Sequence, residues 1–413
     1  MLKLLNKPFL FQLFYMLAFA VAVCYNGNMC EEIKLNFDPS APVAISRCEK
    51  YDVDEIAAVL ETQLRSLGIS PEFFAGRRVV VKPNLIMAAS PDRMATTHPA
   101  VVEAALRVIG ACSPASVTVA ESPGGPYQPA LLRASYHATG IAAAAKRAGA
   151  TLNFDTSVKT VGYPDGKVSK SFELLTPAAE AEVIVNICKL KTHSLTQMTA
   201  AVKNLFGFVA GTDKVAMHAR FPNPQSFSKY LVDLASAVAT ICPTLNIVDG
   251  IVGMEGNGPT AGAPKPFGCI ITGRNPFGVD VLCEYLLRLE GQVMTTSEAR
   301  ARGLCRKDVS ELALVCEGQV ALYRPAKVVS AETKQRHILT HLPRFLRPRP
   351  VIDQALCVGC GVCAKSCPAE TITMANKKAH IAHNKCILCY CCQEMCRFRA
   401  VKIRKNILLR LVR

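Results

Sequence analysis

The chain has 413 residues, half of them apolar, which is enough for two or three packed domains and excludes a disordered protein. Nine of its 19 cysteines lie between Cys357 and Cys396 and ten are scattered singly, a distribution that excludes the disulfide framework of a small secreted domain and indicates metal binding in a reducing compartment. The net charge is +16, but residues 323–413 hold 18 Lys and Arg against four Asp and Glu, so the basic character belongs to the C-terminal part.

Residues 1–28 form an apolar N-terminal extension. Lys3 and Lys7 precede the run PFLFQLFYMLAFAVAVC, which is typical of a signal-peptide core or a short membrane anchor. Export conflicts with cytoplasmic assembly of metal clusters, and no twin-arginine signal is present. A mis-assigned start with Met29 as the true one, or a non-functional extension, is the favoured interpretation, and an anchor or a signal peptide are the alternatives.

Residues 42–322 alternate short β-branched runs with amphipathic stretches, the pattern of an α/β domain with a mostly parallel sheet and crossover helices. Strands are predicted at residues 42–48, 77–85, 115–122, 181–190, 244–250, 267–273 and 311–316. Helices are predicted at residues 53–67, 99–109, 129–148, 226–241 and 276–289, with N-caps at Asp52 or Asp54, at Thr97 or Thr96, and at Asn223 and Asn275.

Four of the predicted strands end in polar residues. Ligands of parallel sheets bind beyond the carboxyl ends of the strands, so we predict that these side chains converge in one crevice. Lysines with acids there suit a small anionic ligand, a carboxylate or a phosphate, or a metal between the acids. Singly, a lysine at a strand end is usually solvated and Asp-Gly is usually a turn. The candidate catalytic residues are Lys82, Asn84, Glu121, Lys189, Lys191, His193, Asp249 and Glu255.

Other features of this domain are weaker. Lys189, Lys191 and His193 share a strand parity and would face one side. His98, His193 and His218 are candidate ligands or proton carriers, against a structural or surface role. The loop DGIVGMEGNGPTAGAPKP is rich in glycine but lacks the spacing of a nucleotide-binding motif, and the scattered cysteines are interpreted as core thiols.

The cysteine-rich region, residues 351–400, is the strongest signal. Two runs of the form C-x2-C-x2-C-x3-C follow one another, the spacing of a small α+β bacterial ferredoxin domain with two [4Fe–4S] clusters, in which the fourth cysteine of each run ligates the other cluster. A pair of zinc sites is the alternative, which two complete four-cysteine runs disfavour. One cluster would take Cys357, Cys360, Cys363 and Cys396, and the other Cys386, Cys389, Cys392 and Cys367.

Two residues of the second run depart from this pattern. Cys391 is a fifth cysteine, interpreted as a packing thiol rather than an alternative ligand or a redox thiol. Arg397 stands where Pro follows the last cysteine of the first run, and this change would either loosen the second loop or raise the potential of the neighbouring cluster through its positive charge. Residues 323–350 are predicted to be a basic linker, and residues 401–413 a basic amphipathic tail.

Several stretches together resemble the protein family of the domain of unknown function 362, which often carries such a ferredoxin domain. They are VVVKPNL, TTHPAVVEAAL, AESPGG, VNICKLKTH, AVKNLFG, VDGIVGMEGNGP and CILCYCC, and the resemblance extends over residues 42–399. It implies no catalytic residue for the α/β part, because the activity of that family is unsettled. For the ferredoxin part it implies that the eight matching cysteines bind clusters that pass single electrons.

Three functions follow as hypotheses. In the first, the ferredoxin domain passes electrons to a reaction or partner at the α/β crevice, as in an iron–sulfur oxidoreductase. In the second the protein is a plain electron carrier whose α/β domain docks partners, and in the third it binds an anionic ligand and its clusters are structural or sensory. We expect an acidic redox partner, a small anionic ligand and peripheral membrane contact through the tail, and we do not expect binding to nucleic acid. The expected location is the cytoplasm, with membrane association as a possibility.

Overall fold

The computed structural model describes residues 27–316, 320–331 and 347–404. The apolar run before residue 27, most of the linker and the end of the basic tail therefore lie outside the described residues. Within the described ranges, no helix is both long enough and apolar enough to cross a membrane.

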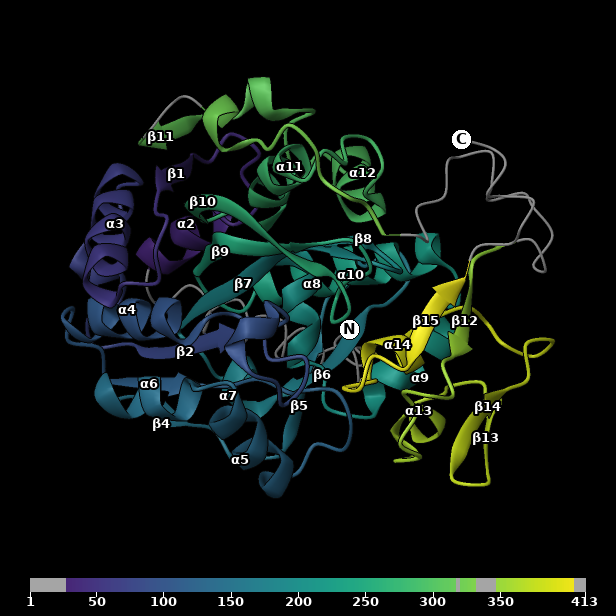
Figure 1. Ribbon diagram of the computed structural model, residues 1–413. Helices are drawn as coiled ribbons and strands as arrows, with labels where there is room; N and C mark the ends of the chain where they lie inside the picture. Colours follow the sequence, from purple (N-terminus) through teal and green to yellow (C-terminus); the bar gives the residue numbers. More distant parts are fainter. Residues whose placement is uncertain (1–26, 317–319, 332–346, 405–413) are drawn as a thin grey trace, which may run out of the picture.

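The α/β domain is built on one twisted sheet with the order β11-β1-β10-β9-β7-β2-β3-β4, and β8 pairs with β7 (Figure 1). Pairs β2–β3, β2–β7, β3–β4, β7–β9 and β1–β11 are parallel, and β1–β10, β9–β10 and β7–β8 are antiparallel. The strands are β1 (Val43–Arg47), β2 (Arg78–Pro83), β3 (Ser116–Val119), β4 (Thr151–Leu152), β7 (Val183–His193), β8 (Gln197–Thr199), β9 (Thr244–Glu255), β10 (Ala263–Gly273) and β11 (Leu314–Cys316). The predicted mostly parallel α/β sheet is confirmed.

Helices cover both faces of this sheet, because alternate residues of its central strands enter different apolar cores. Val183, Val185 and Ile187 of β7 pack with α3 (Val53–Ser66), α4 (Pro99–Gly110) and α6 (Ile141–Arg147). Ile184 and Cys188 of the same strand pack on the other face. That face is covered by α8 (Ala201–Asn204), α10 (Pro224–Ala239), α11 (Pro276–Leu286) and α12 (Met294–Ala301).

Helix starts follow the predicted caps with one exception. Asp52, Asn223 and Asn275 cap α3, α10 and α11 by accepting hydrogen bonds from backbone N–H groups of the first turn. The cap of α4 is His98, whose Nδ1 accepts from the N–H of Ala100, so the prediction of Thr97 or Thr96 was wrong. Thr97 is buried, and its hydroxyl donates to the Ile187 carbonyl.

The single helix predicted over residues 129–148 is two helices. The first is α5 (Pro129–Ala138), and α6 begins after Gly140. Gly140 has a φ of 75°, a left-handed conformation that ends one helix and redirects the chain into the next. A separate hairpin of β5 (Val158–Gly162) and β6 (Ser171–Leu175) was not predicted.

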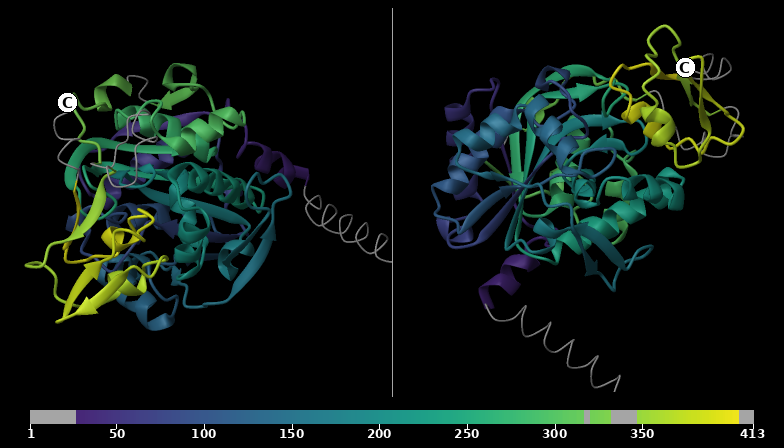
Figure 2. Two further views of the ribbon diagram at one scale, coloured as in Figure 1. Left: turned by 90° about the vertical axis from the view of Figure 1, so that its right-hand side faces the viewer. Right: turned by 90° about the horizontal axis from the view of Figure 1, so that it is seen from below.

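The C-terminal domain is the expected small α+β unit. It has two antiparallel pairs, β12 (Arg349–Ile352) with β15 (Val401–Arg404) and β13 (Ile372–Ala375) with β14 (Lys378–Ile381). Two single-turn helices, α13 (Val362–Lys365) and α14 (Cys391–Glu394), carry cysteines of the two runs. The domain lies beside the sheet with α14 toward the α/β domain and the β13–β14 hairpin away from it (Figures 1 and 2).

Candidate functional site

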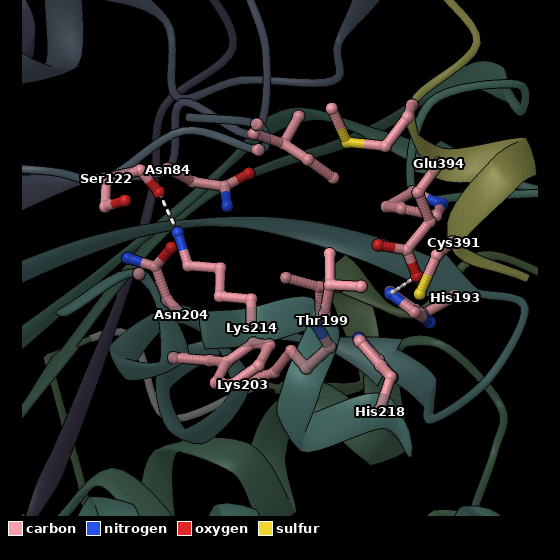
Figure 3. A pocket seen from close by; sticks show the side chains of 18 of the residues that line it. Asn84, Ser122, His193, Thr199, Lys203, Asn204, Lys214, His218, Cys391 and Glu394 are labelled. Carbon is pink, nitrogen blue, oxygen red and sulfur yellow. Dashed lines mark hydrogen bonds and ion pairs between the residues drawn. The ribbon is translucent and has the colours of Figure 1, made fainter. Parts of the chain in front are cut away.

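A cavity with about 730 Å³ of empty space, part of it open to solvent, lies between the two domains (Figure 3). The sheet and its connecting loops supply Asn84, Glu121, Lys191 and His193, the segment after β8 supplies Lys203, Lys214 and His218, and the ferredoxin domain supplies Cys391, Glu394 and Met395. Cys391 and Glu394 lie beside His193 on one side of this cavity, with Asn84, Ser122 and Asn204 across from them. We call it the interdomain cavity.

Three lysines make the interdomain cavity cationic. Lys191 is fully buried at the end of β7, and its Nζ donates to Asn84 Oδ1 at 2.7 Å and to the Ala95 carbonyl at 2.5 Å. Burial lowers the pKa of Lys191 to about 7, and the pKa of Lys214 to about 7 as well. Burial also lowers the pKa of Lys203. Within the described residues, none of these lysines forms a salt bridge with a carboxylate.

Local hydrogen bonds place two of these lysines. Helix α8 is fixed at its start, where the N–H of Ala201 donates to Asp280 Oδ1 at 2.7 Å. It is fixed at its end by Asn204, whose amide donates to Asn186 Oδ1 at 2.8 Å, so Lys203 is held at the cavity. Lys214 lies in α9 (Asp213–Arg220), and its Nζ donates to the Ser122 carbonyl across the cavity wall.

The two domains meet in a His–Glu contact. His193 Nδ1 accepts from the backbone N–H groups of Leu195 and Thr196, so the proton of the neutral ring is on Nε2. That Nε2 lies 3.1 Å from Glu394 Oε1 of α14. Burial lowers the pKa of His193 to about 4 although Glu394 opposes the shift, so the ring that faces the Glu394 carboxylate is neutral at pH 7.

Five buried polar atoms at the interdomain cavity have no hydrogen-bond partner in the described structure: Nε2 of His193, Oγ1 of Thr199, Oδ1 of Asn204, Nδ1 of His218 and Oε1 of Glu394. The His218 ring stacks on Phe227 with a centroid distance of 4.3 Å, and burial lowers its pKa to about 3. Buried polar atoms are nearly always paired with protein, water or ligand. His218 and Thr199 are therefore suited to bind a polar ligand.

Lys82 lies behind the cavity wall rather than in it. It is fully buried and ion-paired with Glu121, which lines the interdomain cavity. Burial lowers the pKa of Lys82 and the Glu121 carboxylate opposes this. The pair packs directly against Gly207, where any Cβ would collide with both groups. Lys82 therefore neutralises Glu121, and Glu394 is the remaining carboxylate that faces the three cavity lysines.

Lys189 and Asp249 form a second polar cluster that does not line the interdomain cavity. Lys189 Nζ lies 2.8 Å from Asp249 Oδ2 and donates to the Tyr51 hydroxyl at 2.8 Å. The Tyr51 ring stacks on His98 at 3.6 Å. The pairing of β7 with β9 shifts register between Lys189 and Lys191, and of these two lysines only Lys191 lines the interdomain cavity.

Glu255 also lies outside the interdomain cavity, at the end of β9. Its Oε2 accepts from the N–H of Val329 at 2.8 Å and lies 3.9 Å from Lys265 Nζ. Among the described residues, no three His, Cys, Asp or Glu side chains converge on a point that could hold one metal ion. The candidate catalytic residues that do converge are Asn84, Glu121, Lys191 and His193.

The glycine-rich loop after β9 docks the ferredoxin domain. The Asn257 carbonyl accepts from Gln393 Nε2 at 2.9 Å, and the Thr260 hydroxyl donates to the Glu394 carbonyl at 3.3 Å. Gly124 approaches Met395 so closely that a Cβ at this position would collide with the Met395 sulfur. These contacts hold α14 as one wall of the interdomain cavity.

Two smaller cavities lie inside the ferredoxin domain, and each is lined by one of the predicted cysteine sets. The first, about 360 Å³, is lined by Cys357, Cys360, Cys363 and Cys396. The second, about 300 Å³, is lined by Cys367, Cys386, Cys389 and Cys392. The fourth cysteine of each run, Cys367 or Cys396, thus lies beside the first three cysteines of the other run. Four thiols around a mostly apolar volume fit a [4Fe–4S] cluster, and we call these the first and second cluster cavities.

The backbone of the two cluster loops repeats as their sequences do. Gly359 and Gly361 have φ values of 72°, and the corresponding Leu388 and Tyr390 have 59° and 62°. Left-handed residues between the ligands turn successive cysteines toward one centre. The second loop adopts this shape without glycine, which costs conformational strain. Cys391 lines neither cluster cavity but the interdomain cavity, where it is buried.

Reasoning from the sequence missed Lys203, Lys214 and Met395. Lys203 lies inside AVKNLFG, one of the stretches that carried the family resemblance, and this was the available signal. Lys214 lies on a short helix whose charged residues are typical of a solvated surface. Met395 is apolar and gave no signal.

Two family models match the chain: "Domain of unknown function (DUF362)" over residues 79–284 and "4Fe-4S dicluster domain" over residues 349–397. A thylakoid-associated protein of Synechocystis sp. is 31% identical over 320 residues, 74% of this chain and 92% of that protein. An uncharacterized ferredoxin of Methanocaldococcus jannaschii is 36% identical over 59 residues, 13% of this chain and 36% of that protein. A solved structure, the lactate racemase apoprotein from Thermoanaerobacterium thermosaccharolyticum, aligns with a TM-score of 0.36 and 13% identity over 60% of this chain and 58% of that one.

Proposed function

We propose that this chain, which belongs to the family of the domain of unknown function 362 and carries a C-terminal 4Fe-4S dicluster domain, is an iron–sulfur oxidoreductase. In this proposal the ferredoxin domain exchanges electrons with a small anionic ligand in the interdomain cavity. One observation carries this proposal. Helix α14, which follows Cys389 and precedes Cys396, forms a wall of that cavity through Cys391, Glu394 and Met395. The ligand and the cluster domain therefore share a boundary.

The residues around this boundary fit electron exchange. Two [4Fe–4S] clusters, each able to pass one electron, would be held by the two four-cysteine sets. Met395 lines both the first cluster cavity and the interdomain cavity. One apolar side chain thus borders both volumes.

The charge of the cavity defines the class of ligand. Lys191, Lys203 and Lys214 form no salt bridge with a carboxylate among the described residues, and Glu121 is ion-paired with Lys82, so the three lysines outnumber Glu394, the other carboxylate that lines the cavity. Ammonium groups that are partly removed from water bind carboxylate or phosphate oxygens through charge-assisted hydrogen bonds. We therefore propose a small organic acid or a phosphorylated compound.

Two of the lysines also suit proton exchange. The pKa values of Lys191 and Lys214 are lowered to about 7, so each can donate or accept a proton near neutral pH. A two-electron reduction of an organic acid takes up two electrons and two protons. The electrons would come from a reduced partner protein through the ferredoxin domain, and the protons from these two ammonium groups.

Location is part of the proposal. The Synechocystis relative is named as a thylakoid-associated protein, which supports peripheral contact of this chain with a membrane. The amphipathic run RKNILLRLVR, most of which lies outside the described residues, supplies basic and apolar residues for such contact. Binding to anionic vesicles that weakens with salt would test this part separately.

Equilibrium binding of sulfate and succinate to the anaerobically purified full-length holoprotein tests the ligand site. Lys203→Gln should weaken binding about tenfold or more, because it removes one charged hydrogen-bond donor. The matched control is Lys265→Gln, at a lysine outside the interdomain cavity, which should leave binding unchanged.

Potentiometric EPR of the same proteins tests the electronic link. Bound anion should lower the midpoint potential of the nearer cluster, since negative charge opposes reduction, and reduction should weaken anion binding by the same factor. Clusters that dithionite cannot reduce, or a potential that ignores a bound anion, would contradict the proposal.

A further inference from the structure

The side chains that cover the first cluster cavity on its outer side are apolar and exposed. Val358 and Met374 line that cavity, yet 57% and 40% of their surfaces face solvent. Leu356, next to the ligand Cys357, is 44% exposed, and the ligand Cys360 is itself exposed. Only six large apolar side chains in the described ranges are at least 40% exposed, and three of them belong to this loop and hairpin. We call Leu356, Val358 and Met374 the outer patch.

The loop that carries Leu356 and Val358 is tied to the hairpin that carries Met374. Gly359 packs against the turn between β13 and β14, where a Cβ would collide with the Lys377 carbonyl. Lys378 Nζ donates to the carbonyls of Cys357 at 2.5 Å and Gln354 at 2.8 Å, which ties the loop to the hairpin. The hairpin points away from the α/β domain in two views, so the outer patch is not part of the interdomain contact (Figures 1 and 2).

The surroundings of the outer patch are cationic. Residues 347–404 contain ten Lys and Arg against three Asp and Glu. Of the three acids, Glu394 is buried at the interdomain cavity and Asp353 is ion-paired with Lys402. Lys377 is exposed beside the patch. Arg397 lies 4.9 Å from the ring centroid of Phe398, which lines the first cluster cavity.

We infer that the outer patch docks an acidic protein with a one-electron redox centre, and that electrons are exchanged with it there. The inference rests on the proposed function, because it assigns the two ends of one electron path through the first cluster. Val358 and Met374 lie at the end that faces the partner, and Met395 lies at the end that faces the ligand. In each transfer the partner's centre loses one electron and the first cluster, going from the 2+ to the 1+ state, gains it. An apolar patch surrounded by basic residues, which we call the rim, is complementary to the surface of an acidic redox protein.

A second copy of this chain is the alternative occupant. It would bring two rims of like charge together, which opposes association. The three side chains of the patch also offer far less apolar area than a stable homodimer requires. The positive charge around the outer patch therefore favours an acidic partner. The small apolar area of the patch favours a partner that binds transiently.

The probe for the test is an acidic plant-type [2Fe–2S] ferredoxin, added to the full-length holoprotein under anaerobic conditions. Its dissociation constant is measured by calorimetry at about 20 mM and about 200 mM salt, where screening separates charge-driven from apolar contact. Two variants act on the surface: Lys377→Glu on the rim and Val358→Ser in the outer patch. Their controls are Lys307→Glu and Leu131→Ser, which change exposed residues of the α/β domain.

We expect saturable binding that weakens at least tenfold at the higher salt, and a further loss of about threefold to tenfold in each surface variant, with the controls at wild-type affinity. EPR spectra confirm that the clusters are intact in every variant. Three results would overturn the inference. The probe could fail to bind at low salt, the control variants could lose as much affinity as the surface variants, or sedimentation could show a dimer that Val358→Ser abolishes. Lys203→Gln should bind the probe as wild type does, so failure of the ligand site and failure of the docking surface give different results.

Discussion

Replacing Asp249 by Ala should destabilise the fold and leave the interdomain cavity intact. Asp249 is fully buried, and its carboxylate accepts from three donors: Lys189 Nζ at 2.8 Å, the N–H of His98 at 2.9 Å and the Tyr51 hydroxyl at 3.1 Å. The variant leaves the Lys189 ammonium buried without its counter-ion. Breaking a buried pair in this way costs about 3–5 kcal/mol of unfolding free energy.

The double variant Lys189→Met with Asp249→Leu provides the comparison. It removes both charges and fills their volume with apolar groups, so we expect it to be much closer to the wild type than Asp249→Ala. Urea unfolding of the α/β domain, followed by far-UV circular dichroism, measures the free energies. Sulfate binding to the folded variants measures the cavity.

The reasoning would be refuted by either of two results. Asp249→Ala could unfold at the urea concentration of the wild type, which would mean that the Lys189–Asp249 pair contributes nothing to stability. It could also lose sulfate binding with unchanged stability, which would place the pair in the ligand site, as the strand-end pattern first predicted.

Three further predictions concern the cavity and the clusters. Cys391→Ser should retain the wild-type iron and sulfide content, whereas loss of a whole cluster would make Cys391 a ligand. Arg397→Pro should lower the potential of the cluster bound by Cys396 in potentiometric EPR, and an unchanged potential would remove the charge argument. Sulfate, whose charge is constant from pH 6 to 8, should bind about tenfold more weakly at pH 8, because Lys191 and Lys214 lose their protons near pH 7. The same lowered pKa values should make the unliganded protein more stable as pH rises from about 7 toward 10, since the unfolded chain then binds more protons, and a pH-independent affinity and stability would contradict both statements.

The local part of the fold could be predicted from the sequence because local physics determines it. The β-branched runs form strands, and the side chains of Asp52, Asn223 and Asn275 satisfy the first N–H groups of their helices. The break at Gly140 was missed, since a glycine within an apolar stretch is compatible with one helix until the chain direction is known.

The candidate site could be predicted only in part. Polar strand ends identified Asn84, Glu121, Lys191 and His193, because parallel strands end at the same edge of a sheet. The same pattern also selected Lys189 and Asp249, which form a buried ion pair elsewhere. The pairing of β7 with β9 shifts register between Lys189 and Lys191, and such a shift depends on the partner strand as well as on β7.

The sequence by itself determined the cysteine sets, because the spacing of thiols within a short loop fixes which of them can face one cluster, and the cavities inside the ferredoxin domain are lined accordingly. Only the tertiary structure decided what that domain faces. His193 and Glu394 are 201 positions apart in the sequence, yet they meet at the interdomain cavity because the glycine-rich loop after β9 docks α14 there. A contact of that separation depends on how two folded surfaces fit, which no local pattern encodes.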